Sequence, residues 1–255
     1  MTRVRCLTYN IDGGTVAYLE SLCAVLTHAQ ADIIALTEAN DAEVVATLAK
    51  RLSLQHVWAK GSGDRHVALL SRFPVAAWHV YHTPPLTQAA LEVRLQLPNS
   101  ETLTVYNVHL LPYLLLPFEL RRWQAVGRLL EIIHTNRPGP HLIVGDLNAI
   151  APGDRVLQPQ NPPRMRRLMA WQFNVIFHLA IPRLLAAGYV DCFRRLHSSE
   201  DGFTWMPQNR TTRYDYILAE APLADKLRAC QVVDDIDVVA LASDHLPLMA
   251  EFDLR

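Results

Sequence analysis

The sequence predicts an α/β layered fold built on mixed β-sheets, and two features of the chain support this prediction. Short apolar runs that are typical of buried strands alternate with segments of helical periodicity along most of the chain. Pairs of strand-like runs joined by short turns, as in β-hairpins, occupy its middle. The chain has 255 residues, half of them hydrophobic, and no linker, repeat or low-complexity run divides it. We therefore expect a single domain over residues 1–255, with one substantial core.

In the first half of the chain, predicted strands and helices follow one another closely. Loose alternation of apolar and polar residues indicates the first strand, and Thr15 is the expected N-cap of the helix after it. A continuous apolar run, Ala-Asp-Ile-Ile-Ala-Leu, is typical of a buried strand. The expected elements are strands at 3–11, 31–36, 67–70 and 75–82, and helices at 15–30 and 41–52.

The second half repeats this alternation. A Pro-Asn-Ser turn separates two strand-like runs, and Arg-Pro-Gly ends a long segment of helical spacing. The apolar run that begins at His141 ends abruptly in Gly-Asp-Leu-Asn at 145–148, which is an unusual end for a strand because Asp and Asn are disfavoured there. The expected elements are strands at 91–97, 103–108, 213–218 and 246–252, a strand of four residues from His141 that runs into Gly145, and a helix at 119–134.

Composition excludes some classes of protein. A net charge of −1 and a pI near 6.8 argue against a protein that coats long nucleic acid through bulk electrostatics. The four cysteines show no Cys-x-x-Cys pairing, which favours reduced, buried thiols over a disulfide framework or a zinc site. The chain starts directly in strand-like sequence, without the charged and then apolar pattern of a signal region, so we expect a cytoplasmic protein.

Polar side chains recur at or beside the ends of the apolar runs, where layered folds usually place their chemistry. Any one of them has a simpler explanation as a turn residue, a charge near a helix N-terminus or a core histidine. Nine such positions are better explained by one shared polar site. They are Asn10, Asp12, Glu38, His109, Asp146, Asn148, Asp215, Asp244 and His245.

The residue types in this set point to phosphate chemistry with a metal ion. Clustered carboxylates repel one another or raise one another's pKa unless a cation lies between them. Oxygen ligands favour Mg²⁺, with Mn²⁺ as the alternative, and the lack of paired cysteines or of a His-x-His motif argues against zinc. The histidines and carboxamides supply donors for phosphoryl oxygens and a candidate acid or base.

The motifs that carry these residues resemble the endonuclease/exonuclease/phosphatase superfamily, in that superfamily's order from Asn10 to His245. They are Asn10, Leu-Thr-Glu at 36–38, Asn-Val-His at 107–109, Gly-Asp-Leu-Asn at 145–148, Arg-Tyr-Asp-Tyr-Ile at 213–217 and Ser-Asp-His at 243–245. The resemblance implies a four-layer αββα sandwich of two packed mixed β-sheets flanked by helices, with the site at one rim. One departure is Thr37, which stands where many relatives have a glutamine, so that glutamine contact is absent here.

The resemblance also implies roles for individual residues. Glu38 would be the main metal ligand, with Asn10 close to it and Asp12 and Asp244 as further contributors. Asp146 would orient or deprotonate the attacking water, and Asn148 would hold the phosphate and the nucleophile. His245 would contact the phosphoryl oxygens or act as a base, with Asp215 fixing its tautomer. The remaining substrate contacts would come from Asn10, Asn148, His109 and Arg213, and His109 would bind the phosphate or assist the leaving group.

Three functions are compatible with this sequence. The resemblance favours a metal-dependent phosphodiesterase that acts on nucleic acid, at short, single-stranded or end-proximal sites because the overall charge is low. The alternative is an enzyme of the same chemistry that hydrolyses lipid or inositol phosphates, in contact with a lipid or membrane surface. The third is a catalytically silent binding module, which the complete motif set disfavours. No protein partner is implied, and we expect a monomer.

Two segments do not fit a plain nuclease. The loop at 110–118 is unusually apolar for the neighbourhood of a phosphate site. An insertion at about 151–187 opens with Arg-rich sequence and continues as an apolar stretch that is too short and too often interrupted to span a membrane. Residues 151–213 hold nine arginines against four acidic residues, which indicates a solvated surface or a path for an anionic substrate. We expect a helix at 168–181 that packs against the 110–118 loop as a lid or a small subcore over the cleft.

Overall fold

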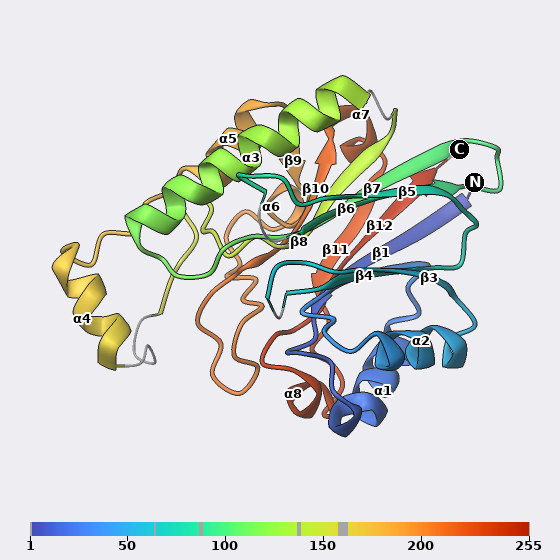
Figure 1. Ribbon diagram of the computed structural model, residues 1–255, viewed down its shortest axis with the longest axis horizontal. Coiled ribbons are helices and arrows are strands. Elements are labelled where there is room, and N and C mark those ends of the chain that lie inside the picture. Colours follow the sequence, from blue (N-terminus) through green and yellow to red (C-terminus); the bar gives the residue numbers. More distant parts are fainter. Residues whose placement is uncertain (1, 64, 87–88, 137–138, 158–162, 255) are drawn as a thin grey trace.

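A computed structural model describes residues 2–63, 65–86, 89–136, 139–157 and 163–254 (Figure 1). Its centre consists of two six-stranded sheets. The first sheet has the order β11 (Leu227–Val232), β12 (Leu248–Leu254), β1 (Thr2–Asn10), β2 (Ile33–Thr37), β4 (Val67–Ser71) and β3 (Gln55–Ala59). The second has the order β5 (Val75–Tyr81), β6 (Ala89–Gln96), β7 (Thr102–His109), β8 (His141–Asp146), β10 (Asp215–Glu220) and β9 (Tyr189–Asp191).

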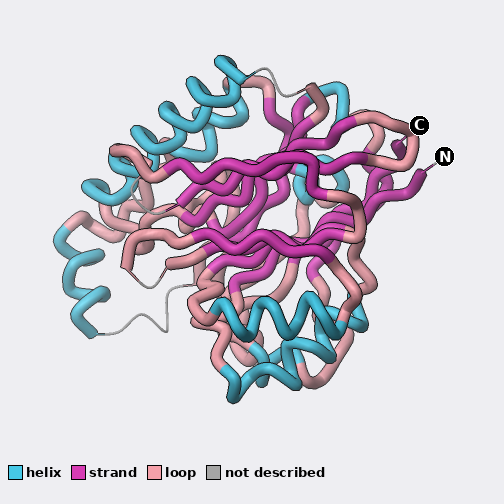
Figure 2. Tube along the Cα trace, turned by 45° about the vertical axis from the view of Figure 1, so that its right-hand side comes forward, coloured by secondary structure: helices cyan, strands magenta, loops and turns pink. Residues whose placement is uncertain are grey.

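Helices cover the outer face of each sheet (Figure 2). The first sheet is covered by α1 (Leu19–Ala29), α2 (Ala42–Arg51) and α8 (Val239–Ala242). The second is covered by α3 (Leu116–Asn136) and α5 (Ala180–Ala186). The other helices in the described residues are η1 (Val16–Tyr18), α4 (Pro163–Trp171), α6 (Cys192–Leu196) and α7 (Ala221–Ala224). This arrangement confirms the predicted four-layer αββα sandwich.

The central strands are largely apolar on both faces because both of their faces are buried. In β1, Val4 and Cys6 point into the core between the sheets, whereas Leu7 and Tyr9 point outward beneath the helices. Side chains alternate between the two faces of a strand, so a strand in this position needs a nearly continuous apolar sequence. The same reason explains why the run at 31–36 could be recognised as a strand without alternation.

The pairing of the strands brings the polar strand ends to one rim. β1 and β2 run parallel, with Asn10 opposite Thr37, so both strands end at the same edge of the first sheet. In the second sheet β7 and β8 are also parallel. β10 runs antiparallel to β8 and begins where β8 ends, with Asp215 opposite Asp146.

Several predicted elements differ from the observed ones. The helix expected at 15–30 starts as the short 3₁₀ helix η1, and the Thr15 side chain makes no capping hydrogen bond. The helix expected at 168–181 is wrong: α4 ends at Trp171, and α5 starts only at Ala180. The break follows from Phe173 and Asn174, which have φ angles of 58° and 55° and so cannot continue a right-handed helix.

The edge strand β3 was not predicted. Its first two residues, Gln55 and His56, are exposed, so the apolar pattern covers only its second half.

All four cysteines are free thiols, and three of them are buried. Among the residues that the structure describes, no helix combines the length and the apolar content that crossing a membrane requires.

Candidate active site

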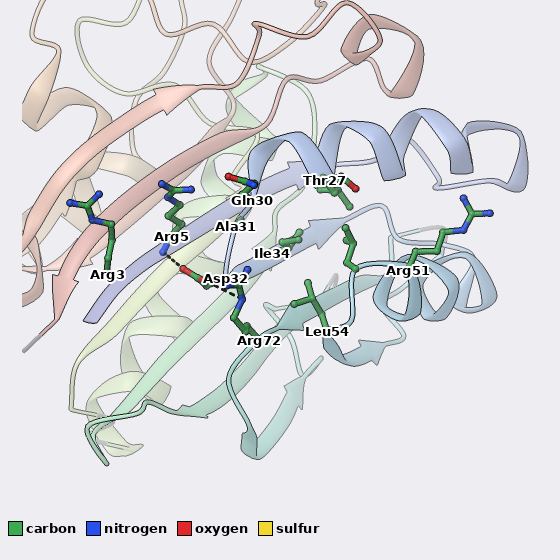
Figure 3. A pocket seen from close by; sticks show the side chains of 12 residues that line it. Arg3, Arg5, Thr27, Gln30, Ala31, Asp32, Ile34, Arg51, Leu54 and Arg72 are labelled. Atoms are coloured by element: carbon green, nitrogen blue, oxygen red, sulfur yellow. Dashed lines mark hydrogen bonds and ion pairs between the residues drawn. The ribbon is translucent and has the colours of Figure 1, made fainter. Parts of the chain in front are cut away.

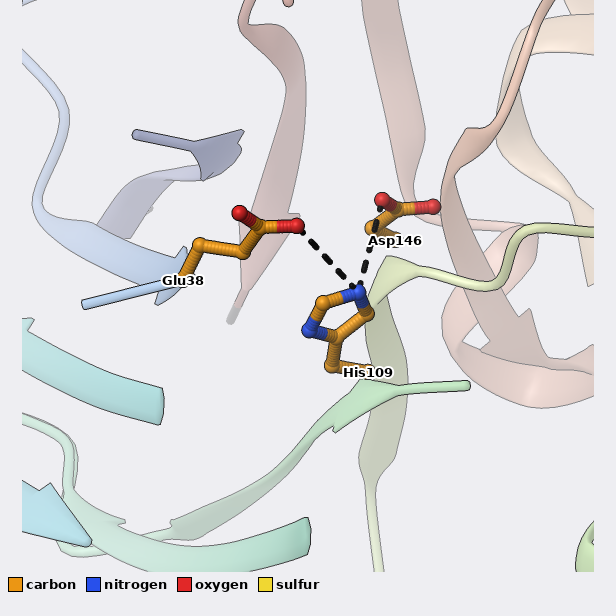
Figure 4. A group of neighbouring side chains, drawn as sticks. All are labelled: Glu38, His109 and Asp146. Carbon is orange, nitrogen blue, oxygen red and sulfur yellow. Dashed lines mark ion pairs between the residues drawn. The ribbon is translucent and has the colours of Figure 1, made fainter. Parts of the chain in front are cut away.

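Three predicted site residues meet where the two sheets come together (Figure 4). Nε2 of His109 lies 3.8 Å from Oε1 of Glu38 and 3.7 Å from Oδ2 of Asp146. Donor atoms of the three residues lie within 4.8 Å of one another, so together they could hold a metal ion. His109 and Asp146 are buried, whereas the Glu38 side chain is 31% exposed. Two carboxylates and an imidazole at this spacing suit a divalent cation, which would offset the repulsion between the carboxylates.

Glu38 is presented by a strained backbone. It follows the last residue of β2 and has a φ of 52°, which is uncommon for a residue with a long side chain. Such strain is found most often at functional sites, where the surrounding structure enforces it. Burial raises the pKa of Glu38, and a hydrogen bond from Asn10 opposes that rise.

Asn10 links the carboxylates of the two sheets. Its amide nitrogen donates to Oε1 of Glu38 at 3.2 Å and to Oδ2 of Asp146 at 3.0 Å. Its side-chain oxygen, Oδ1, accepts a hydrogen bond from the backbone N–H of Asp12. Asn10 therefore fixes the separation between Glu38 and Asp146.

A second group of side chains joins the first through Asp146. Nδ1 of His245 lies 2.8 Å from Oδ2 of Asp215, and its Nε2 lies 3.9 Å from Oδ2 of Asp146. The backbone N–H of His245 donates to Oγ of Ser243, which itself donates to the carbonyl of Asn10. The imidazole of His245 is thus held between the ends of β1 and β10.

The Gly-Asp-Leu-Asn motif works through both its side chains and its backbone. Gly145 has a φ of 131°, and a Cβ there would collide with the carbonyl oxygen of Val108, so only glycine fits. The backbone N–H of Asn148 donates to Oδ1 of Asp146 at 2.9 Å. The Asn148 amide donates to the carbonyl of Leu110, which places the side chain at the pocket wall.

Burial and neighbouring charges set the protonation of the site. Burial, reinforced by the Asp215 carboxylate, raises the pKa of Asp146. Burial, with Arg65 and His245 nearby, lowers the pKa of His109 to about 3, so this imidazole is neutral at pH 7. Burial alone would lower the pKa of His245, but the adjacent Asp215 carboxylate outweighs it and raises that pKa to about 10. His245 is therefore the cationic imidazole of the site.

These groups open into a cavity of about 300 Å³. One side of the cavity is polar and the other is apolar. The lining residues are Glu38, Arg65, His109, Pro112, Tyr113, Leu114, Asp146, Asn148, Met169, Trp205, Tyr214, Asp244 and His245. Arg65 was missed in the sequence, although it precedes β4, whose first residue pairs with Thr37 beside Glu38. No local sequence pattern indicates that β2 pairs antiparallel with β4, and this pairing brings Arg65 to the cavity.

The apolar wall of the cavity is held by helix α3. Arg122 is buried beside Glu119 and donates to the carbonyls of Leu111 and Tyr113. Glu119 accepts hydrogen bonds from the backbone N–H groups of Leu179 and Ala180 at the start of α5. One ion pair on α3 therefore fixes both the 110–118 loop and helix α5, near the end of the predicted insertion.

The predicted contact between the 110–118 loop and a helix at 168–181 is made instead by the turn after α4, and residues 116–118 of that loop form the first turn of α3. Residues 158–162 of the predicted insertion lie outside the described residues. The side-chain nitrogen of Gln172 donates to the carbonyl of Leu114 at 2.8 Å, and its oxygen accepts from the backbone N–H of Leu116 at 3.1 Å. Met169, on α4, is buried and lines the cavity. Gln172 and Met169 thus connect this segment to the cavity wall, and its role as a lid or a small subcore stays a prediction.

One predicted substrate contact is wrong. Arg213 is fully buried, and its guanidinium pairs with Asp191 at 2.7 Å and with Asp154 at 2.8 Å. With all its charge taken up by two buried carboxylates, it cannot reach a substrate. Its motif is structural, because it anchors the segment before β10 that carries Asp215.

The path of arginines expected along residues 151–213 is also largely occupied by ion pairs. Arg155, Arg194, Arg195 and Arg210 each pair with a carboxylate. Asp12 is exposed and lies outside the groups that could hold a metal, as does the half-exposed Asp244. Asp244 lines the cavity, and the metal roles of Asp12, Asp244 and Asn10 remain predictions.

Another cavity, at the opposite ends of β1 and β2, is lined by four arginines, yet it does not resemble a phosphate site (Figure 3). Arg3 and Arg5 both pair with Glu251, at 3.1 and 3.0 Å. Arg72 pairs with Asp32. Arg51, the fourth, pairs with Glu20. Each of these charges already has a partner.

Comparisons with known proteins agree with the fold and the motifs. Residues 7–245 match the profile described as the Endonuclease/Exonuclease/phosphatase family. Exodeoxyribonuclease III of Haemophilus influenzae is 30% identical over 146 residues, which are 53% of this chain and 54% of that protein. The chain thus matches about half the length of this curated relative.

Solved structures extend the likeness to the whole chain. The 3′ phosphatase NExo from Neisseria, bound to a product DNA hairpin, has a TM-score of 0.75 at 19% identity and covers 98% of this chain and 100% of its own. An AP endonuclease from Archaeoglobus fulgidus has a TM-score of 0.74 at 20% identity, with the same coverage of both chains. At these identities the solved structures establish a shared fold. Because the family profile spans nearly all of the sequence, the chain belongs to the endonuclease/exonuclease/phosphatase family.

Proposed function

We propose that this protein is a divalent-metal-dependent hydrolase of phosphoric esters, which cleaves phosphodiesters by attack of water on phosphorus. The observation that carries the proposal is the convergence of Glu38, Asp146 and His245 on one cavity, from strand ends far apart in the sequence. A carboxylate for a metal, a carboxylate of raised pKa and a cationic imidazole are the groups that such a reaction needs.

Glu38 would hold the cation, since its side chain is the more open of the two carboxylates in the donor group and its neighbour Asn10 fixes its position. Oxygen donors favour Mg²⁺, with Mn²⁺ as the alternative. When bound, the cation would polarise a phosphoryl oxygen and offset negative charge in the transition state.

Asp146 would orient and deprotonate the attacking water. Its raised pKa makes it a better proton acceptor than an ordinary aspartate, as a general base near neutral pH requires. Asn10 and the backbone N–H of Asn148 each donate to one of its oxygens, so the carboxylate cannot rotate away. Asn148 itself lies at the cavity wall and can donate to a phosphoryl oxygen.

His245 would act as a cationic donor to the phosphoryl oxygens rather than as a base. With a pKa of about 10 it keeps its proton at neutral pH, and Asp215 holds Nδ1, which leaves Nε2 toward the cavity. His109 stays neutral, so it would bind the phosphate or the leaving group as a hydrogen-bonding partner and not as a charged acid. The expected acceleration of hydrolysis therefore comes from electrostatic stabilisation of the transition state and from positioning of the reacting groups.

Nucleic acid is the substrate class that the relatives support. One is an exodeoxyribonuclease, one is an AP endonuclease and one is a 3′ phosphatase bound to a DNA hairpin. The Arg65 side chain adds a cation to the cavity. Because the net charge is only −1, we propose short, single-stranded or end-proximal sites rather than long duplex tracts.

Lipid or inositol phosphate esters are the second candidate, favoured by the apolar wall of the cavity. Pro112, Tyr113, Leu114 and Met169 would give a polar headgroup phosphate an apolar neighbour. A nucleobase could pack on the same apolar wall. The two candidate substrates therefore differ in the part of the molecule that lies outside the cavity.

A substrate panel with Mg²⁺ and with Mn²⁺ tests the proposal. It comprises abasic duplex DNA, single-stranded DNA ends, RNA and sphingomyelin, each with and without EDTA. The proposal predicts metal-dependent cleavage of at least one nucleic acid. Cleavage of sphingomyelin alone would favour the second candidate. A failure of all four substrates with both metals would overturn hydrolysis and leave a binding module.

A further inference from the structure

The helix α4 and the turn after it carry an exposed apolar surface, which we call the apolar ridge: Leu168, Trp171, Phe173 and Val175. Trp171 and Phe173 are each 89% exposed, Leu168 is 49% exposed and Val175 is 46% exposed. Figure 1 shows α4 projecting from the rest of the molecule, beyond the layers of the sandwich. Isolated apolar residues are common on protein surfaces, but four within eight positions on a projecting element form a patch.

The two aromatic residues of the ridge bury little surface in the fold, because each is 89% exposed. Phe173 adopts a φ of 58°, which is unfavourable for a bulky aromatic residue, and its ring contributes almost nothing to the core. The chain therefore accepts backbone strain to place an aromatic ring in solvent. Strain without a packing benefit is a reason to look for a function.

The ridge is fixed to the wall of the active-site cavity. Gln172, between the two aromatic residues, bonds to the backbone of Leu114 and Leu116 and donates to the carbonyl of Val175 at 2.7 Å. On α4, the buried Met169 lines the cavity while its neighbour Leu168 is exposed. Met169 and Gln172 thus connect the apolar wall inside the cavity to the apolar ridge outside it.

Two cations lie on the same helix. Arg166 and Arg167 are exposed on α4, and within the described part of the chain no ion pair engages either of them. Most other arginines between 151 and 213 are paired with carboxylates. An apolar ridge flanked by unpaired arginines is complementary to a surface that offers hydrocarbon and anionic phosphate together.

We infer that the apolar ridge docks this enzyme on an anionic membrane surface. Trp171 and Phe173 enter the boundary between headgroups and acyl chains, while Arg166 and Arg167 contact lipid phosphates. Single-stranded nucleic acid is the competing occupant, because aromatic side chains also stack on bases. Two observations favour lipid. Rings that are 89% exposed stand out in solvent instead of lying flat as a stacking platform, and Leu168 and Val175 add aliphatic surface that bases do not stack on.

This inference goes beyond the proposed hydrolysis and does not depend on it, because docking requires no turnover. It places the mouth of the active-site cavity beside the lipid surface, since Met169 and Leu114 line that cavity and α4 carries the ridge. An enzyme docked in this way would meet phosphate esters at or near the membrane.

Vesicle sedimentation with the full chain tests the inference. The probes are vesicles of phosphatidylcholine, and of phosphatidylcholine with phosphatidylglycerol, in the absence of any substrate. The wild-type protein should sediment with the anionic vesicles. The double variant Trp171→Ala, Phe173→Ala should bind them more weakly by roughly tenfold for each ring removed. Arg166→Gln with Arg167→Gln should remove the preference for anionic over neutral vesicles.

Trp78→Ala is the matched control, because Trp78 is 55% exposed but lies on β5, an edge strand of the second sheet. This variant should bind vesicles like the wild type. A wild-type protein that stays in the supernatant, or a Trp78 variant that loses binding as strongly as the ridge variant, would overturn the inference.

Two further measurements keep the outcome unambiguous. Phe173→Asn should keep or raise the melting temperature, because Asn tolerates a positive φ, and it should still weaken vesicle binding. Fluorescence anisotropy with a single-stranded oligonucleotide tests whether the ridge binds nucleic acid, the competing occupant. If the ridge variant loses affinity for the oligonucleotide while vesicle binding is absent or unchanged, the ridge is a nucleic-acid surface and the membrane inference fails.

Discussion

Oδ2 of Asp215 lies 2.8 Å from Nδ1 of His245, and this contact decides where the positive charge of the site resides. Asp215 begins β10 in the second sheet, and His245 precedes β12 in the first, so the pair also joins the two sheets. Of the two histidines in the cavity, only His245 has a carboxylate on its inner nitrogen. Nδ1 of His109 is buried without a hydrogen-bond partner among the described residues, and that imidazole is neutral.

The first prediction concerns the alkaline limb of the pH profile. His245 acts as a donor only while protonated, so activity should persist at neutral pH and fall as the pH rises through about 10. In Asp215→Asn the largest of the effects that raise the pKa of His245 is lost while burial remains, so this pKa falls and the alkaline limb moves to lower pH. At neutral pH kcat should drop by roughly 10²- to 10⁴-fold. A profile of kcat/KM against pH with an unmoved alkaline limb would contradict this role.

The second prediction concerns the acid limb. Asp146 must be deprotonated to act as a base, so activity should disappear as the pH falls through its raised pKa. The amide of Asn10 donates to the charged carboxylate and lowers that pKa. Asn10→Ala should therefore move the acid limb to higher pH, in addition to lowering activity. An acid limb that moves to lower pH would show that Asn10 does not stabilise the Asp146 carboxylate.

The third prediction tests whether Arg213 stabilises the fold or binds the substrate. Its replacement by alanine leaves Asp191 buried without its counter-charge and leaves Asp154 paired with Arg194 alone. The free energy of unfolding should fall by about 3–5 kcal/mol, as measured by urea denaturation. Arg155→Ala is the control, because the pair that Arg155 makes with Asp201 is exposed and its loss should cost less than ~1 kcal/mol. If Arg213→Ala were as stable as the wild type but had a raised KM, Arg213 would be a substrate ligand.

The fourth prediction concerns the glycine before Asp146. In Gly145→Ala the new Cβ meets the carbonyl of Val108, so β8 must shift and the Asp146 carboxylate moves with it. Both the melting temperature and kcat should fall. Gly153→Ala is the matched control, since Gly153 also has a positive φ, of 87°, but a Cβ there meets no atom within 4 Å. The control should show only the conformational cost, about 1 kcal/mol. Equal losses in both variants would mean that crowding at Gly145 is unimportant.

Much of the site could be predicted because its residues stand at the ends of strands. Asn10, Glu38, His109 and Asp146 each follow an apolar run, and parallel pairing within each sheet brings these ends to one edge. The order of the motifs could be read directly from the chain. Their convergence across two sheets required the resemblance, because no local pattern specifies how two sheets face each other.

The remaining features depend on contacts that are distant in sequence. Arg65 enters the cavity because β4 runs antiparallel to β2, and the residues of the loop itself give no sign of that pairing. Arg213 looked like a substrate ligand because its two buried partners lie 22 and 59 residues away. The helix expected at 168–181 breaks at Phe173 and Asn174, next to Gln172, whose side chain bonds to the backbone of Leu114 and Leu116. Helical spacing alone cannot reveal such tertiary bonds.

Metal-dependent turnover of a generic phosphodiester, bis(4-nitrophenyl) phosphate, by the wild type and by Glu38→Gln tests the central claim most directly. The wild type should require Mg²⁺ or Mn²⁺ and lose activity with EDTA, and the variant should fold normally but turn over roughly 10²- to 10⁴-fold more slowly. Glu43→Gln, at an exposed glutamate on α2, should behave like the wild type. Metal-independent turnover, or a Glu38→Gln variant as active as the wild type, would contradict a metal site built on Glu38.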